Sequence, residues 1–242
     1  MTADFESTRL FLHGSSLSAL PDDVTSQRQL TTLDLSHNQL MDLPEAIGDL
    51  RALEFLYVSN NKLSRLPESM GKLKALIYLN VANNALTALP ETIGALGSLV
   101  ELRAHDNGIK SLPYSIGALA TLRELHLDNN GLQELPDSIG RLTSLRVLHL
   151  RRNALISLPR SIRSLDRVTH LVLRGNRLTT LPDALGEMRQ LMHLDLRENQ
   201  LTSLPEALRE LQSLEKLDLR WNGLPETPWL GELRERGCVV YT

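Results

Sequence analysis

Apolar and polar positions alternate along the chain in a unit of 23 residues that recurs from one end of the sequence to the other. Asparagine marks the unit, and it falls at Asn38, Asn61, Asn84, Asn107, Asn130, Asn153, Asn176, Asn199 and Asn222. A leucine lies five residues before each of these asparagines, a second apolar residue lies three before it, and proline follows six after it. This regularity indicates an internal structural repeat.

The unit at 30–52, LTTLDLSHNQLMDLPEAIGDLRA, shows which elements the pattern predicts. Leu33 and Leu35 alternate with polar residues, which is the period of a half-buried β-strand. Asn38 interrupts the apolar pattern where the chain must turn, and a buried amide there has to satisfy backbone donors and acceptors. Pro44 disfavours a continued strand. The apolar residues after this proline are three apart, which predicts short 3₁₀ or helical turns.

A single unit has one apolar face and cannot bury it alone, so successive units must stack with their strands in a parallel sheet, about 4.8 Å apart. We therefore predict one solenoid domain of about ten units whose sheet is about 45 Å long, with shallow curvature. Residues 1–29 are expected to form an N-terminal capping repeat, because polar Ser7, Ser15 and Gln27 replace the usual residues of the pattern. Residues 30–224 form regular repeats, and 225–242 form a C-terminal cap with a short helix and a last strand.

The consensus LxxLxLxxNxLxxLPxxIGxLxx resembles the leucine-rich repeat family, in the 23-residue form of stand-alone intracellular and bacterial members. The resemblance covers residues from about 10 to 224. It implies an α/β repeat fold, a curved solenoid with parallel strands on the concave side and short 3₁₀ or helical turns on the convex side. It also implies non-catalytic binding of proteins. Enzymes that resemble this chain carry a further domain beside the repeats, and no residues remain here to build one, so no enzyme is expected.

Composition and charge narrow the choice of function only slightly. The chain has 242 residues, 42% of them apolar, and a net charge of -3, which gives no bias toward nucleic acid or anionic membrane. A single cysteine, Cys238, excludes an intrachain disulfide. The start of the chain, MTADFESTRLFLHG, has early acids and no apolar core, so we expect no secretion signal. The expectation is a cytoplasmic monomer; delivery as an effector by a signal-less secretion system stays open.

The outward-facing positions of the strands carry the candidate binding residues, because the fold does not dictate them. The residue two before the asparagine is arginine on four adjacent strands: Arg151, Arg174, Arg197 and Arg220, here called the arginine ladder. Like charges on neighbouring strands are destabilising unless they are neutralised. Either a salt-bridge lattice with Asp195, Asp218 and Glu198 tolerates the ladder, or the ladder accepts carboxylates or phosphates from a partner.

Toward the N-terminal side the same face carries aromatic side chains. Phe55, Tyr57 and Tyr78, here called the aromatic patch, lie at outward positions of two adjacent strands, and Phe11 lies two units earlier. Exposed aromatic residues are typical of interface anchors, although isolated ones are also normal on surfaces. The patch is therefore predicted to contact an apolar portion of a partner.

Histidines occupy the middle of the face, at His105, His126, His149, His170 and His193. A metal site is geometrically conceivable, but no His-x₃-His or Cys–His spacing supports one, so no metal or other cofactor is expected. Protonation of these histidines would favour acidic partners below about pH 6.5.

The sequence thus predicts a protein- or peptide-binding scaffold for a partner with an acidic segment. The predicted partner-binding residues are Phe55, Tyr57, Tyr78, Arg103, His126, His149, Arg151, Arg174, Arg197, Arg220 and Trp221. No catalytic residue, small-molecule substrate or membrane contact is expected. Phosphate or nucleic-acid binding through the ladder is the alternative, and the negative net charge disfavours it.

Overall fold

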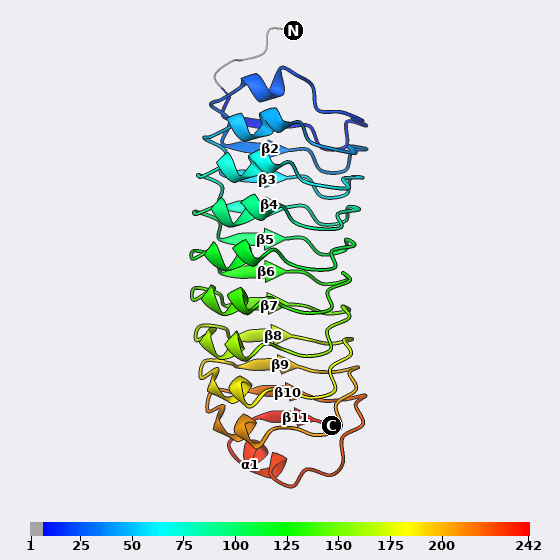
Figure 1. Ribbon diagram of the computed structural model, residues 1–242, viewed down its shortest axis with the longest axis vertical. Helices are drawn as coiled ribbons and strands as arrows, with labels where there is room; N and C mark the ends of the chain where they lie inside the picture. The colour runs from blue at the N-terminus through cyan, green and yellow to red at the C-terminus, as the bar shows by residue number, and fades with distance from the viewer. Residues whose placement is uncertain (1–6) are drawn as a thin grey trace.

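The computed structural model describes residues 7–242 and shows one long stack of parallel strands (Figure 1). The single sheet has 11 strands in sequence order, each paired with the strand of the next unit. The strands are β1 (Arg9–Phe11), β2 (Thr32–Asp34), β3 (Phe55–Tyr57), β4 (Tyr78–Asn80), β5 (Glu101–Arg103), β6 (Glu124–His126), β7 (Val147–His149), β8 (His170–Val172), β9 (His193–Asp195), β10 (Lys216–Asp218) and β11 (Val239–Tyr241). We expect no secretion signal from the sequence of residues 1–14, and the first six of these residues lie outside the described part of the chain.

The register of the sheet follows the repeat without a slip. Leu33 pairs with Leu56 and Leu148 pairs with Leu171, so residues 23 apart in sequence lie side by side through the stack. The central leucine of β2 to β10 is buried, and the residues on either side of it point away from the core. Side chains in one sequence column therefore become direct neighbours across strands.

Short 3₁₀ turns form a second column beside the strands, as the spacing after the proline predicts (Figure 1). They are η1 (Val24–Ser26), η2 (Glu45–Asp49), η3 (Glu68–Lys72), η4 (Glu91–Ala95), η5 (Tyr114–Ala118), η6 (Asp137–Arg141), η7 (Arg160–Ser164), η8 (Asp183–Glu187) and η9 (Glu206–Glu210). The proline before each of η2 to η9 has φ between −65° and −71°, which a proline ring fixes at no cost. Apolar residues of these turns, such as Ile47 and Ile116, are fully buried against the strand leucines.

The turns stack closely because glycine recurs at the position where one turn faces the next. A Cβ atom added at Gly117 would clash with the backbone carbonyl of Ser138 in the next turn. Close packing of the turns keeps their side of the stack from spreading apart, so the stack curves little. Figure 1 shows a nearly straight column rather than a tight horseshoe. The expectation of shallow curvature agrees with this arrangement.

The repeated asparagine satisfies the backbone at the turn, as its position in the pattern predicts. In a typical unit, Asn176 Nδ2 donates to the carbonyl oxygens of Leu150 and Leu173, at 2.9 and 2.8 Å. Its Oδ1 accepts from the backbone N–H of Leu155 at 3.1 Å. Each asparagine thus ties its own turn to the preceding unit, and this replaces hydrogen bonds that the turning backbone cannot make for itself.

The C-terminal end of the stack contains the short helix and the last strand that the sequence predicts there. At the C-terminus, helix α1 (Leu230–Glu235) buries Leu230 and Leu233, and β11 pairs in parallel with β10. Gly237, with φ of 91°, lies between helix and strand, and Cys238 is buried. No helix in the described part of the chain is both long and apolar enough to cross a bilayer.

Candidate functional site: the strand face

The candidate site is the solvent-facing side of the sheet, here called the strand face. It is formed by the first and third residues of each strand and by the two residues directly before each repeated asparagine. All the predicted partner-binding residues lie on this surface or, for Trp221, at its margin. The register divides them into three neighbouring regions along the stack, which are described in turn.

The aromatic patch lies on β3 and β4, and its members are half-buried rather than fully exposed. Phe55 pairs in register with Tyr78, and the rings of Tyr57 and Tyr78 are 4.9 Å apart between centroids. Arg103 lies over Tyr78, with its guanidinium carbon 5.8 Å from the ring centroid. Burial raises the pKa of the Tyr78 hydroxyl above its usual value, so it remains a neutral hydrogen-bonding group. The patch is a preformed apolar surface with polar edges.

Phe11 does not join this cluster. The side chain is 61% exposed, and Asp34 on β2 lies between it and Tyr57 in the register. The sequence places Phe11 two units before the patch, and the intervening strand keeps it separate.

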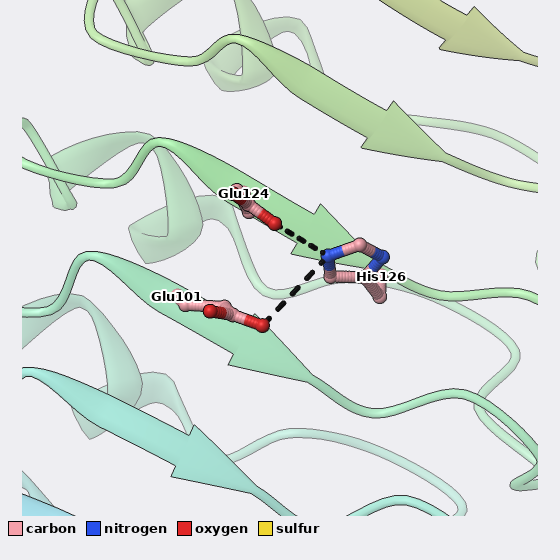
Figure 2. Close-up of side chains that lie close together, drawn as sticks. All are labelled: Glu101, Glu124 and His126. Atoms are coloured by element: carbon pink, nitrogen blue, oxygen red, sulfur yellow. Dashed lines mark hydrogen bonds and ion pairs between the residues drawn. The ribbon is translucent and has the colours of Figure 1, made fainter.

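In the middle of the face, Glu101, Glu124 and His126 converge from β5 and β6 (Figure 2). His126 Nε2 is 3.1 Å from Glu124 Oε2 and 4.0 Å from Glu101 Oε1. Glu101 also forms an ion pair with Arg103, at 2.5 Å. One ligand atom from each of the three residues lies within 4.8 Å of the others, so this group could hold a metal ion.

The histidines form two pairs on adjacent strands. His126 Nδ1 lies 3.3 Å from His149 Nδ1, and the rings of His170 and His193 are 4.4 Å apart between centroids. Burial lowers the pKa of His105, His149 and His170 below the ordinary value for histidine. These three side chains are consequently neutral at pH 7 and resist protonation in the folded state.

Three members of the arginine ladder are paired with carboxylates. Arg220 donates to both oxygens of Asp218, at 3.0 and 2.7 Å, while Arg197 donates to Asp195 and also lies 3.4 Å from Asp218. Arg174 donates from Nε and Nη2 to Glu198. The sequence places Glu198 beside Arg197, but the left-handed backbone at Glu198, with φ of 55°, accompanies a side chain that reaches Arg174 on the preceding strand.

Arg151 differs from the rest of the ladder. Within residues 7–242 its guanidinium has no carboxylate at ion-pair distance, and its Nε is buried without a hydrogen-bond partner. The neighbouring Asp128 accepts from the backbone N–H of Arg151 at 2.7 Å and lies 3.7 Å from His149. The salt-bridge lattice therefore includes Arg174, Arg197 and Arg220 but stops before Arg151.

Trp221 lies beside the end of the ladder and does not pack under the C-terminal cap. It is 61% exposed and has a left-handed backbone, with φ of 60°. The guanidinium carbons of Arg220 and Arg174 are 5.3 and 5.9 Å from the centroid of its ring. This stacking extends the arginine ladder with an exposed apolar surface.

Two acidic residues of this group, Glu101 and Glu124, are not singled out by the sequence pattern. Both occupy the outward position six before the asparagine, and they are register partners on adjacent strands. Two like charges in one column on neighbouring units were the available signal, because such a pair needs a neutralising partner. Residues 141–177 contain nine arginines and a single acid, Asp166, but these arginines do not form one surface. Arg160 and Arg163 belong to η7, whereas Arg151 and Arg174 lie on the strand face.

Comparison with known proteins agrees with the geometry of the repeats. Residues 8–63 match a family model described as leucine rich repeat, and residues 68–154 and 138–235 match one described as leucine-rich repeat region. No curated protein matches the chain.

Solved structures show the same fold. A leucine-rich repeat protein from Leptospira interrogans is 30% identical, with a TM-score of 0.73, and the match covers 94% of this chain and 64% of that one. The ectodomain of the plant membrane receptor kinase GASSHO1/SCHENGEN3 from Arabidopsis thaliana, in complex with CASPARIAN STRIP INTEGRITY FACTOR 2, is 31% identical, with a TM-score of 0.81, over 92% of this chain and 28% of that one. The functional domain of InlJ from Listeria monocytogenes, at 24% identity and a TM-score of 0.79, shares the fold over 97% of this chain and 53% of its own.

The chain spans less than two thirds of the length of each of these three structures. The repeat pattern, the stacked sheet with its 3₁₀ turns and the family models that together match most of the sequence lead to one assignment: this chain belongs to the leucine-rich repeat family.

Proposed function

We propose that the chain is a non-catalytic scaffold whose strand face binds an extended segment of a partner protein, with an apolar portion on the aromatic patch and an acidic portion at Arg151. Leucine-rich repeat proteins are commonly scaffolds for protein binding. The similar plant ectodomain was solved in complex with CASPARIAN STRIP INTEGRITY FACTOR 2, which supports a protein ligand for this face as well.

The observation that carries the proposal is the contrast within the arginine ladder. A partner carboxylate at Arg174, Arg197 or Arg220 must displace an internal carboxylate, so little net interaction is gained there. At Arg151 no such exchange is needed among the described residues, so a partner carboxylate can pair with the guanidinium without displacing an internal one. A hydrogen bond between two ionised groups is stronger than one between neutral groups.

The distance between the two regions fits an extended ligand. The aromatic patch is on β3 and β4, and Arg151 follows β7, so about three strand spacings of 4.8 Å separate β4 from β7. Arg151 also lies four residues farther along its chain than Val147, which is in register with Tyr78, and this adds about 13 Å in the direction of the strands. The combined span of about 20 Å corresponds to about six residues of extended chain, at roughly 3.3 Å each. A peptide with an aromatic or aliphatic residue and an acidic residue at this separation would reach both regions.

The test is selection of peptides from a random display library by the full chain, followed by fluorescence anisotropy with the selected sequences. We expect enrichment of Asp or Glu about six residues from an apolar residue. Arg151→Gln should weaken binding about tenfold or more, since a hydrogen bond to a charged group contributes about 1.5–3 kcal/mol.

Arg167→Gln is the matched control, because it removes the same charge from an exposed position between η7 and β8. It should leave the affinity unchanged. Selected peptides without acidic residues, or equal affinities for wild type and Arg151→Gln, would refute the assignment of Arg151. A second variant, Tyr57→Ala, reports separately on the aromatic patch.

A further inference from the structure

Glu101, Glu124 and His126 bring two carboxylates and an imidazole to one point of the strand face (Figure 2). We propose that these three residues bind a divalent transition-metal ion of the Zn²⁺ type. The inference goes beyond the proposed binding of a protein segment, and neither depends on the other. It rests on the geometry of the three side chains, on the groups behind them and on the charge of the cluster.

The ligand atoms are already close to a metal-binding arrangement. Ligands in a tetrahedral zinc site are about 2.0–2.2 Å from the ion, which places them roughly 3.3 Å from one another. The two distances from His126 Nε2, 3.1 Å to Glu124 and 4.0 Å to Glu101, lie on either side of that value. Since all three ligand atoms are within 4.8 Å, a small rotation of the glutamate side chains completes the site.

The imidazole of His126 is held by groups on its far side. Its Nδ1 lies 3.3 Å from Nδ1 of His149, the same nitrogen that lies 3.7 Å from Asp128 Oδ2. A histidine that binds a metal through Nε2 carries its proton on Nδ1, and His149 is placed to accept that hydrogen bond. Such outer partners orient a ligating imidazole and strengthen its bond to the ion.

The charge of the cluster also favours a cation. Glu101 and Glu124 are register partners, so their carboxylates repel across adjacent strands. Arg103 compensates one of them through its ion pair with Glu101. With a neutral imidazole, one negative charge is left over, and the side chains of Glu101 and His126 are only 20% and 15% exposed. A divalent ion would neutralise this charge where water screens it incompletely.

The donor set points to the class of ion. Imidazole nitrogen suits Zn²⁺, Ni²⁺ and Cu²⁺, whereas Mg²⁺ and Ca²⁺ prefer oxygen ligands only. Three protein ligands leave at least one coordination position of a tetrahedral ion open. That position faces the solvent side of the sheet, where water or a carboxylate of a bound protein can occupy it.

The test is isothermal titration of the chelator-treated full chain with Zn²⁺ alone. We expect one ion per chain, and about tenfold or greater loss of affinity in Glu124→Gln and in His126→Gln. The control is Glu215→Gln, which makes the same change beside His193, where a histidine and a glutamate lie 3.6 Å apart but belong to no group of three possible ligands in the described part of the chain. Its zinc affinity should equal that of wild type.

A fourth variant, Arg103→Gln, removes the cation that competes for Glu101, so it should bind Zn²⁺ more tightly than wild type. This gain cannot result from a loss of folding, and circular dichroism confirms the fold of all variants. The proposal is overturned by any of three results. These are no saturable binding of Zn²⁺ to wild type, equal affinities for wild type and the two ligand variants, and weaker binding after Arg103→Gln.

Discussion

Asp218 is the carboxylate on which the ordered end of the arginine ladder depends. Its side chain is buried, with 1% of the residue exposed, and it receives two hydrogen bonds from Arg220, at 3.0 and 2.7 Å. Arg197 lies 3.4 Å away on the other side. The change Asp218→Asn keeps the size of the side chain and one acceptor oxygen but removes the charge. Two guanidinium groups on adjacent strands then face each other without the carboxylate between them.

The expected cost lies between two limits. Removing one partner from a fully buried ion pair costs about 3–5 kcal/mol, whereas an exposed pair contributes about 0–1 kcal/mol. The side chains of Arg197 and Arg220 are 24% and 38% exposed, so water partly compensates both after the change. We therefore expect Asp218→Asn to lower the free energy of unfolding by about 2 kcal/mol at neutral pH.

The effect should depend on pH in a defined direction. Burial, the largest single influence, raises the pKa of Asp218, but hydrogen bonds from Arg220 and the charges of Arg197 and Arg220 outweigh it and lower the pKa below its usual value. A carboxyl with a lowered pKa stabilises the fold above its unfolded pKa of about 3.9 and loses this contribution as the pH falls through the folded value. The gap between wild type and variant should be full at neutral pH and narrow below about pH 4.

The assay is urea unfolding followed by tryptophan fluorescence, at neutral pH and at acid pH. Both tryptophans, Trp221 and Trp229, lie in the last unit and the C-terminal cap, so the signal reports on this end of the stack. Asp166→Asn, at an exposed position, is the control for removing an acid. The reasoning fails if Asp218→Asn unfolds at the wild-type urea concentration, or if its deficit is undiminished in acid.

Three further predictions concern the stack itself. Asn176→Ala removes an amide with three hydrogen bonds to the backbone, two of them to the preceding unit, so thermal melting should show a loss of about 3 kcal/mol in unfolding free energy. Gly117→Ala should lower the melting temperature because its Cβ would clash with the next turn, whereas Gly97→Ala, which meets nothing within 4 Å, should not. Burial, and to a lesser degree the charge of His193, lowers the pKa of His170. Protonation thus favours the unfolded chain, and the urea midpoint should fall as the pH drops below about 6.5, less so in His170→Gln.

The fold was predictable because the same sequence signals occur in every unit of the repeat. Leu33, Asn38 and Pro44 each have one physical role, and every role recurs at the same offset in the following units. The parallel sheet and the 3₁₀ turns follow from that pattern, and the structure confirms them, as it confirms the last strand predicted separately for the C-terminal cap. The expected ten units and the added cap strand account for the 11 strands of the sheet.

The pairing of charged side chains was less predictable, because it depends on side-chain rotamers and on the left-handed backbone of the residue before each repeated asparagine. Sequence adjacency links Glu198 to Arg197, but Glu198 pairs with Arg174. Spacing rules for metal sites search within one element, whereas Glu101 and His126 meet across two strands. A comparison of equivalent positions in neighbouring units, rather than of neighbours along the chain, shows which side chains can meet.

The same column logic explains why, within residues 7–242, Arg151 has no carboxylate at ion-pair distance and how to give it one. Asp218 lies 21 residues after Arg197 and two before Arg220, and from that position it contacts both. Val172 occupies the equivalent position between Arg151 and Arg174, and it is half-buried. Val172→Asp should therefore extend the lattice by one unit.

This extension tests separately two properties of Arg151, its positive charge and its lack of an internal carboxylate partner. Val172→Asp keeps all four arginines of the ladder, and the new carboxylate is positioned to pair with Arg151 as Asp218 does with Arg197. If Arg151 recognises an acidic segment because it lacks an internal partner, the variant should bind the library-selected acidic peptides about tenfold more weakly, as Arg151→Gln does. Val172→Asn has nearly the same shape and no charge, and it should bind like wild type. Undiminished peptide binding by a folded Val172→Asp protein would mean that the unpaired state of Arg151 does not determine recognition.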